Sequence, residues 1–264
     1  MLNVLRADFY KLRKSKAFWI CTLVGIVVAV LMVVAVQAGI SRSLARADTS
    51  SPEYQQMLAM SKSVSGTWAI TEFLPQGNFI LILAGVFVAI FISAEFGYGT
   101  MKNTLSRGAE RVSVFASKYI TCAVGALFML VMFIAALLVS GTIVWGFGSV
   151  AAGGFAGMVL LQMLLMLAFT AVFVFISMTV RSSGGAIATN IISVMIVSTL
   201  LQALSMLFGS NTDLSQYWLT GAISTLATYT PASGDVIRGV IVALAWGIVT
   251  SAAGLVLFRK TDVK

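Results

Sequence analysis

The amino-acid sequence predicts an all-α integral membrane protein with six transmembrane helices. Of its 264 residues, 59% are hydrophobic and only 10% are charged, and the mean hydropathy is +0.99. Soluble domains carry roughly 45–50% apolar and about 25% charged residues, so this composition excludes a soluble fold. The apolar residues also gather in runs long enough to cross a bilayer, which takes about 20 residues per helix.

Six charge-free runs mark the expected spans. They cover about residues 18–38, 77–94, 119–147, 155–180, 184–208 and 239–258. The first run follows a basic stretch, an order that imitates a secretory signal peptide. It is longer than the 7–15-residue apolar core of such a peptide, so we interpret it as a retained span. The whole chain, residues 1–264, is then one membrane domain.

Residues 1–17, before the first span, predict an amphipathic helix on the inner membrane surface. Apolar residues recur there at helical spacing, at Leu2, Leu5, Phe9 and Leu12. Lys11 and Lys14 fall on other sides of this helix. A plain anchor with positive charges at the membrane surface is the alternative.

The positions of Lys and Arg set the orientation, because cytoplasmic segments carry their excess. With the N-terminus inside, only Arg42, Arg46, Lys62 and Arg238 of the 17 basic residues fall in outer segments. Both termini are therefore expected in the cytoplasm, which an even number of spans requires. Because topology accounts for the net charge of +8, nucleic-acid binding is not expected.

Two outer segments are too long to be simple turns. Residues 40–76 predict a small extracellular cap with a short helix at 53–63. Residues 209–238 are rich in apolar and aromatic side chains, which favour the membrane interface. They predict short helices in the outer leaflet before the last span, and a loop packed on the spans is the alternative.

The longest inner segment, residues 95–118, predicts a short helix between two turns. Gly97 and Gly99 permit a sharp change of direction where the chain leaves the bilayer, and Thr100 is the expected N-cap of the helix. Gly108 is expected to end this helix. A second helix is expected to start near Arg111 and to run into the third span.

At this segment the sequence resembles the membrane subunits of type-2 ATP-binding-cassette (ABC) exporters. The pattern is an acidic residue ending the second span, a Gly-Thr pair, a Leu in a short helix, an Arg, and a Lys before the third span. Here these are Glu95, Gly99-Thr100, Leu105, Arg111 and Lys118. The six spans and the basic N-terminal helix are similar too, and the compact chain resembles bacterial permeases of peptide export and peptide-antibiotic resistance.

The resemblance implies a transport subunit in a bacterial plasma membrane that works with a separate cytosolic ATPase. Two ATPase copies and a second permease, identical or related, would complete the exporter within the membrane lipid. The chain has no phosphate-binding loop, so ATP and Mg²⁺ would belong to the ATPase and no cofactor to this chain. The residues implied in coupling to the ATPase are Thr100, Met101, Lys102, Asn103, Leu105 and Arg107, together with Leu5, Phe9 and Leu12.

Glu95 stands at the expected inner edge of the second span. A carboxylate there is costly unless it is paired or hydrated, so we expect an ion pair with Arg111 or Lys118. Hydration by water among the lipid headgroups is the alternative.

The expected spans hold no charged residue of the kind that proton- or ion-coupled carriers place near the midplane. The possible lining of an apolar passage is Met163, Met166, Asn190 and Gln202. Such a passage suits export of an amphipathic peptide, a peptide antibiotic, a lipid-like molecule or a hydrophobic drug. Simple packing of the methionines, and interhelical hydrogen bonds of the amides, are the alternative.

Two other classes of function stay open. A non-transporting membrane scaffold or immunity protein would bind a peptide or lipid without any ATPase. An intramembrane enzyme would need a catalytic pair near the spans, but the chain has no histidine and no carboxylate inside them. Without histidine and with only two separated cysteines, a metal site is not expected.

Overall fold

The computed structural model describes residues 2–46, 51–74, 78–148, 152–207, 214–226 and 233–260, and these ranges form helices and no strand. Six helices are long and apolar enough to cross a membrane. They are α2 (Lys16–Arg46), α5 (Asn78–Gly97), α7 (Arg111–Trp145), α8 (Ala152–Val180), α9 (Ser183–Leu207) and α11 (Ser233–Lys260). The predicted fold class is confirmed, and the chain is a multi-pass helical membrane protein.

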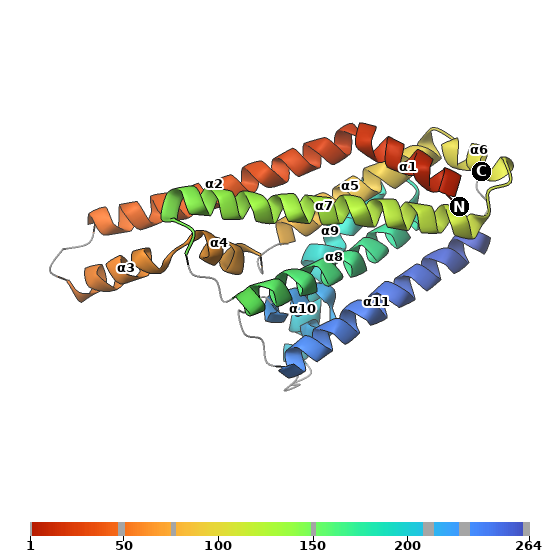
Figure 1. Cartoon of the computed structure of the whole chain (residues 1–264). Coiled ribbons are helices and arrows are strands. Elements are labelled where there is room, and N and C mark those ends of the chain that lie inside the picture. The colour runs from red at the N-terminus through yellow and green to blue at the C-terminus, as the bar shows by residue number, and fades with distance from the viewer. Residues whose placement is uncertain are drawn as a thin grey trace.

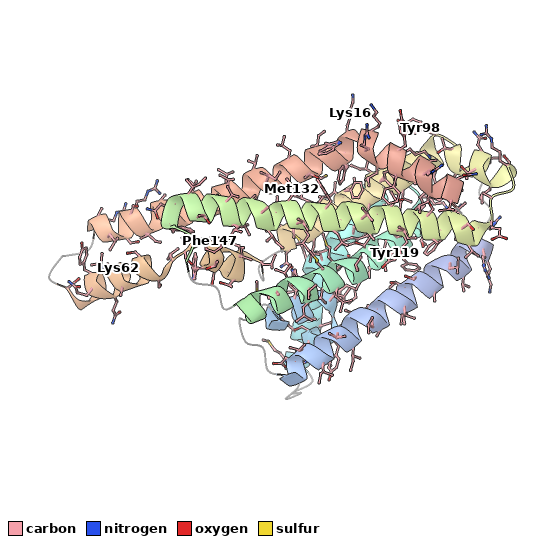
Figure 2. All side chains as sticks on the ribbon, in the orientation of Figure 1. Lys16, Lys62, Tyr98, Tyr119, Met132 and Phe147 are labelled. Atoms are coloured by element: carbon pink, nitrogen blue, oxygen red, sulfur yellow. The ribbon has the colours of Figure 1, made fainter. Side chains whose placement is uncertain are left out.

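The long helices form one elongated bundle with both chain ends at the same end (Figure 1). That end also holds the N-terminal helix α1 (Leu2–Lys14) and the short helix α6 (Thr100–Ser106). The opposite end holds α3 (Pro52–Ser63) and α4 (Gly66–Phe73). Lys16 and Tyr98 mark the first end, and Lys62 and Phe147 mark the second (Figure 2). By the positive-inside rule, we call these the inner and the outer end.

The helices extend beyond the expected spans. α2 continues to Arg46, although its apolar run stops near residue 38. α7 begins at Arg111, although its apolar run starts near residue 119. At 1.5 Å per residue, the 31 residues of α2 and the 35 of α7 are about 46 and 52 Å long, against about 30 Å for the 20 residues of α5. α2 and α7 are thus longer than the hydrocarbon core is thick.

α5 lies at the centre of the bundle, where it packs against α2, α7, α8 and α9. Fully buried aromatic side chains fill this core, including Phe87, Phe133, Phe169 and Phe173. The outer faces of α2, α9 and α11 instead expose large apolar residues such as Leu31, Leu200 and Ile248. Apolar side chains on the surface are stable in a lipid environment, because they contact acyl chains there.

The short helices of the outer end agree with the sequence in part. α3 matches the expected helix at 53–63, whereas α4 was not expected. The 3-10 helix η1 (Leu214–Tyr217) and α10 (Leu219–Leu226) confirm short helices before the last span. They also pack on the spans: Trp218 is buried, and its Nε1 donates to the carbonyl of Ser193 in α9 at 3.1 Å.

Candidate functional site

The turn from α5 into α6 depends on glycine. Gly99 has φ +66°, in the left-handed region that favours glycine, and it occupies the N-cap position of α6. The expected N-cap, Thr100, is instead the first helical residue, and its Oγ1 donates to the carbonyl of Glu95 at 3.3 Å. Gly108, with φ +83°, follows the end of α6, where the sequence predicted that the helix would stop.

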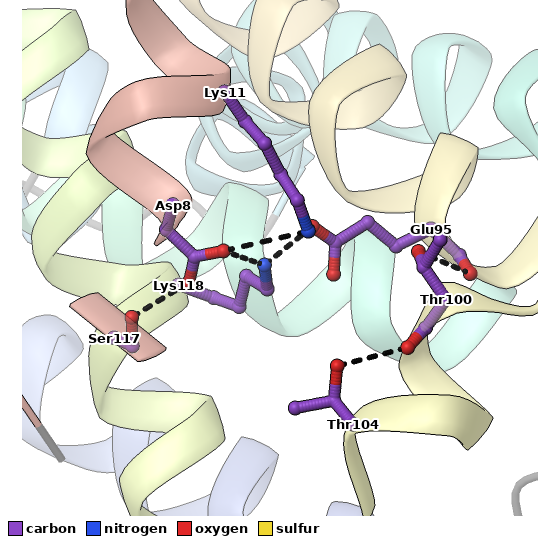
Figure 3. Close-up of polar contacts among 7 residues, drawn as sticks. All are labelled: Asp8, Lys11, Glu95, Thr100, Thr104, Ser117 and Lys118. Atoms are coloured by element: carbon purple, nitrogen blue, oxygen red, sulfur yellow. Dashed lines mark hydrogen bonds and ion pairs between the residues drawn. The ribbon is translucent and has the colours of Figure 1, made fainter. Parts of the chain in front are cut away.

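Behind α6, four charged side chains from three helices meet in one buried cluster (Figure 3). Lys118 Nζ lies 2.5 Å from both Asp8 Oδ1 and Glu95 Oε1. Lys11 Nζ donates to the same Glu95 oxygen at 2.9 Å and lies 3.9 Å from Asp8 Oδ1. Ser117 Oγ donates to the second oxygen of Asp8 at 2.6 Å. We call Asp8, Lys11, Glu95 and Lys118 the inner charge cluster.

Each member of the inner charge cluster is placed by its helix. Asp8 and Lys11 are one turn apart on α1, Glu95 lies in the last turn of α5, and Lys118 lies near the start of α7. Leu12 anchors α1 close beside them: a Cβ added to Gly125 of α7 would lie 3.3 Å from its Cδ1. A glycine at this position of α7 therefore leaves room both for Leu12 of α1 and for the ring of Phe87 of α5.

The cluster contains two carboxylates and two ammonium groups, so its formal charge is zero. Asp8, Glu95 and Lys118 are buried, whereas the side chain of Lys11 is 42% exposed. Charges out of contact with water need partners and further hydrogen bonds, and these four supply both to one another. Lys118 is the shared member, because it pairs with α1 and with α5 at once.

The structure pairs Glu95 with Lys118, one of the two partners that the sequence indicated. The other, Arg111, donates instead to the carbonyl oxygens of Phe258 and Arg259 at 2.8 and 3.0 Å. It thereby ties the start of α7 to the C-terminal turn of α11, where free carbonyls attract a cation. Its position about two turns of α7 before Lys118, beside α11, gives it this different role.

Sequence reasoning missed Asp8 and Lys11. One signal was available, because Leu5, Asp8 and Leu12 share a face at helical spacing. A carboxylate inside the apolar stripe of a basic helix indicates a buried partner. The identity of that partner was not readable, since Asp8 and Lys118 are separated by 110 residues in the chain.

The residues implied in coupling divide into a buried and an exposed set. Met101 is only 1% exposed, Leu12 is buried, and Thr100, Leu105, Leu5 and Phe9 are partly buried. Met101 and Leu12 therefore pack on this chain itself, whereas the other four keep part of their surface accessible, and the implied docking face stays a prediction. Lys102 and Asn103 are exposed on α6, and Arg107, which follows the helix, is exposed as well.

A cavity of about 570 Å³ opens between α1, α6 and α7. Its lining includes all four members of the inner charge cluster together with Asn3, Thr104 and Arg107. Since these charges line the cavity, a change in the position of α6 would alter the space beside them.

The proposed passage residues differ in burial. Met166 is buried and Met163 is partly buried on α8, whereas Gln202 is exposed on α9. Asn190 is buried, and its Nδ2 donates to the carbonyl of Gly85 in α5 at 2.9 Å. Asn190 is thus an interhelical hydrogen-bond donor, which is the alternative that the sequence left open for it.

The family model described as "Protein of unknown function (DUF2705)" matches residues 26–264. The chain belongs to the DUF2705 family. The matched part of this DUF2705 protein includes α6 and two members of the inner charge cluster, Glu95 and Lys118, while α1 precedes it. No curated protein matches the chain.

Proposed function

We propose that this DUF2705 protein is the permease subunit of a bacterial ABC exporter, powered by ATP that a separate cytosolic subunit hydrolyses. The observation that carries the proposal is the position of α6. This short helix presents polar side chains outward at the inner end, and the inner charge cluster that joins α1, α5 and α7 lies directly behind it.

The contacts of α6 favour transmission of force. Met101 is buried in the bundle, and Thr100 bonds to the Glu95 carbonyl, so displacement of α6 pulls on the last turn of α5. Glu95 is bound through Lys118 to α7 and to α1. A push on the exposed side of α6 therefore reaches three helices through short, buried contacts, which is what an externally powered membrane domain requires.

The proposed complex contains two ATPase subunits and a second permease, either identical or related. Its substrate is an amphipathic molecule such as a peptide, a peptide antibiotic, a lipid-like molecule or a hydrophobic drug. The complex lies in the bacterial plasma membrane. Lys102, Asn103 and Arg107 would contact the ATPase, because they are the exposed members of the implied set. A helix that offers several polar donors suits a groove on a soluble partner.

The test is co-purification from native cells in mild detergent, with the associated chains identified and ATP hydrolysis assayed. Wild type is compared with Lys102→Glu/Arg107→Glu at the inner end and with Arg46→Glu/Lys62→Glu, a matched double charge reversal at the outer end. We expect an ATPase with a phosphate-binding loop to accompany wild type and the outer variant.

We expect the inner variant to co-purify with at least about tenfold less ATPase than wild type, because each substitution replaces a cationic donor of the proposed contact surface with a carboxylate that cannot donate. If wild type carries no ATPase, or if both variants retain it equally, the proposal is wrong. Absence of any ATPase favours the scaffold or immunity alternative. Substitution of Met101 is unsuitable for this test, because that side chain is buried in the bundle.

A further inference from the structure

We propose that the outer end holds a binding site for a single-chain amphiphile with an anionic head group. The site arises because α2 and α7 extend beyond the shorter α5 at this end. α3 packs against the projecting end of α2, and α4 packs against α7. Two pockets remain, and they meet at Trp68.

The first pocket is apolar and has a volume of about 300 Å³. Along α2, Ala29 and Val33 are fully buried, and Val36, Ile40 and Ser43 continue the same face into the pocket. Val64 and Trp68 form the facing wall, together with Ser61 and Ser63 of α3. The face of α2 that is buried in the core thus borders an open apolar pocket here, so this pocket suits an acyl chain.

The second pocket, of about 500 Å³, is polar. Trp68 and Trp145 form one side, with their rings 5.8 Å apart in a T-shaped arrangement. Hydroxyl groups of Ser65, Thr67 and Thr71 line it, and Lys62 lies at its edge. Gln37 accepts the indole N–H of Trp145 at 2.6 Å and so fixes that ring to α2. The pocket is therefore held by contacts from four helices.

The chemistry of the lining selects the head group. Among the lining residues that the structure describes, neither pocket has a carboxylate. Within the residues that the structure describes, the ammonium of Lys62 and the indole N–H of Trp68 have no hydrogen-bond or ion-pair partner. Two free donors, one of them charged, favour an anionic group over a cationic one. A cationic amphipathic peptide is disfavoured, because Lys62 repels it and no described lining residue is an acid that could receive it.

The two pockets share Ser63, Val64 and Trp68, so one molecule can occupy both. Its acyl chain would lie between α2 and α3, and its anionic head would lie beside Lys62 and the paired tryptophans. This site is at the end of the bundle opposite α6, and its occupancy does not depend on an ATPase.

The test uses the purified chain in nanodiscs of zwitterionic lipid, titrated with bromododecanoate while tryptophan fluorescence is followed. Bromine quenches an indole at short range, so a bound probe gives a saturable loss of signal, whereas partition into lipid gives a loss without saturation. Dodecyl trimethylammonium carrying the same bromine label is the matched cationic probe.

We expect saturable quenching with the anionic probe only. Lys62→Gln should weaken it about tenfold, as removal of one charged hydrogen bond predicts, and Lys102→Gln at the inner end should leave it unchanged. Ser43→Phe should abolish it by filling the apolar pocket, whereas Ala45→Phe, on an exposed position outside the lining, should not. Quenching without saturation in wild type, equal affinities in Lys62→Gln and wild type, or equal response to both probes would overturn the proposal.

Discussion

Replacement of Lys118 with methionine is expected to destabilise the chain more than the same replacement of Lys11, the other lysine of the inner charge cluster. The side chain is 2% exposed, and its Nζ contacts Asp8 and Glu95 at 2.5 Å each. Methionine keeps an unbranched stem of similar length but removes the charge, so two buried carboxylates are left with Lys11 alone. Removal of one partner from a buried ion pair costs about 3–5 kcal/mol.

Lys11→Met is the matched control, because it removes the other lysine of the same cluster. Its side chain is 42% exposed and its shorter contact is 2.9 Å, so water screens the pair and the expected loss is only about 0–1 kcal/mol. For a chain of this size, about 2–4 °C of Tm corresponds to each kcal/mol.

Thermal unfolding of the purified proteins in one detergent measures the difference. Lys118→Met should lower Tm by roughly 6–20 °C, and Lys11→Met by less than about 4 °C. The triple variant Asp8→Asn/Glu95→Gln/Lys118→Met should recover most of that loss, because no unpaired buried charge remains in it. Equal Tm shifts for the two single lysine variants, or a triple variant less stable than Lys118→Met, would refute the assignment of the cluster as an electrostatic unit.

Two further predictions concern topology and the turn into α6. Cysteine introduced at Lys62 should react with a membrane-impermeant maleimide in intact cells, whereas cysteine at Lys102 should react only after permeabilisation; the two native cysteines are buried and give little background. Gly99→Ala should destabilise the chain by about 1 kcal/mol in thermal unfolding, because alanine is strained at φ +66°. Gly97→Ala is the control and should have no such cost. An added Cβ at Gly97 meets nothing within 4 Å, and φ there is not positive.

The six spans were predictable because a bilayer imposes one strong requirement, a long apolar run, which a single sequence displays directly. The ends of the helices were not predictable in this way. α2 continues to Arg46 because Ser, Leu, Ala and Arg after residue 40 still form helix outside the hydrocarbon, so the loss of hydropathy marks the lipid boundary and not the helix boundary.

α4 was missed for a different reason. It is eight residues long, and its place is set by close approach to α7, where a Cβ on Gly141 would lie 2.8 Å from the Cα of Gly66. That contact joins residues far apart in the chain. The inner charge cluster illustrates the same limit, since Glu95 and Lys118 sit in one local segment and were paired by sequence reasoning, whereas Asp8 meets Lys118 across 110 residues. Periodicity describes the faces of one helix and does not say which helices meet.

The location of the inner charge cluster bears on how the inner end moves. Because Lys118 pairs with α1 and α5 at once, separation of either helix from α7 breaks one of its two ion pairs. Separation of α1 from α7 would leave Asp8 and Lys118 apart at the membrane edge, and such unpaired charges cost several kcal/mol unless water reaches them. The adjoining cavity is the route by which water reaches them. We therefore expect α1, α5 and α7 to move as one block while the cavity keeps its present size, and to separate only when displacement of α6 widens it. Under the proposed function, the ATPase would control that step from the exposed side of α6.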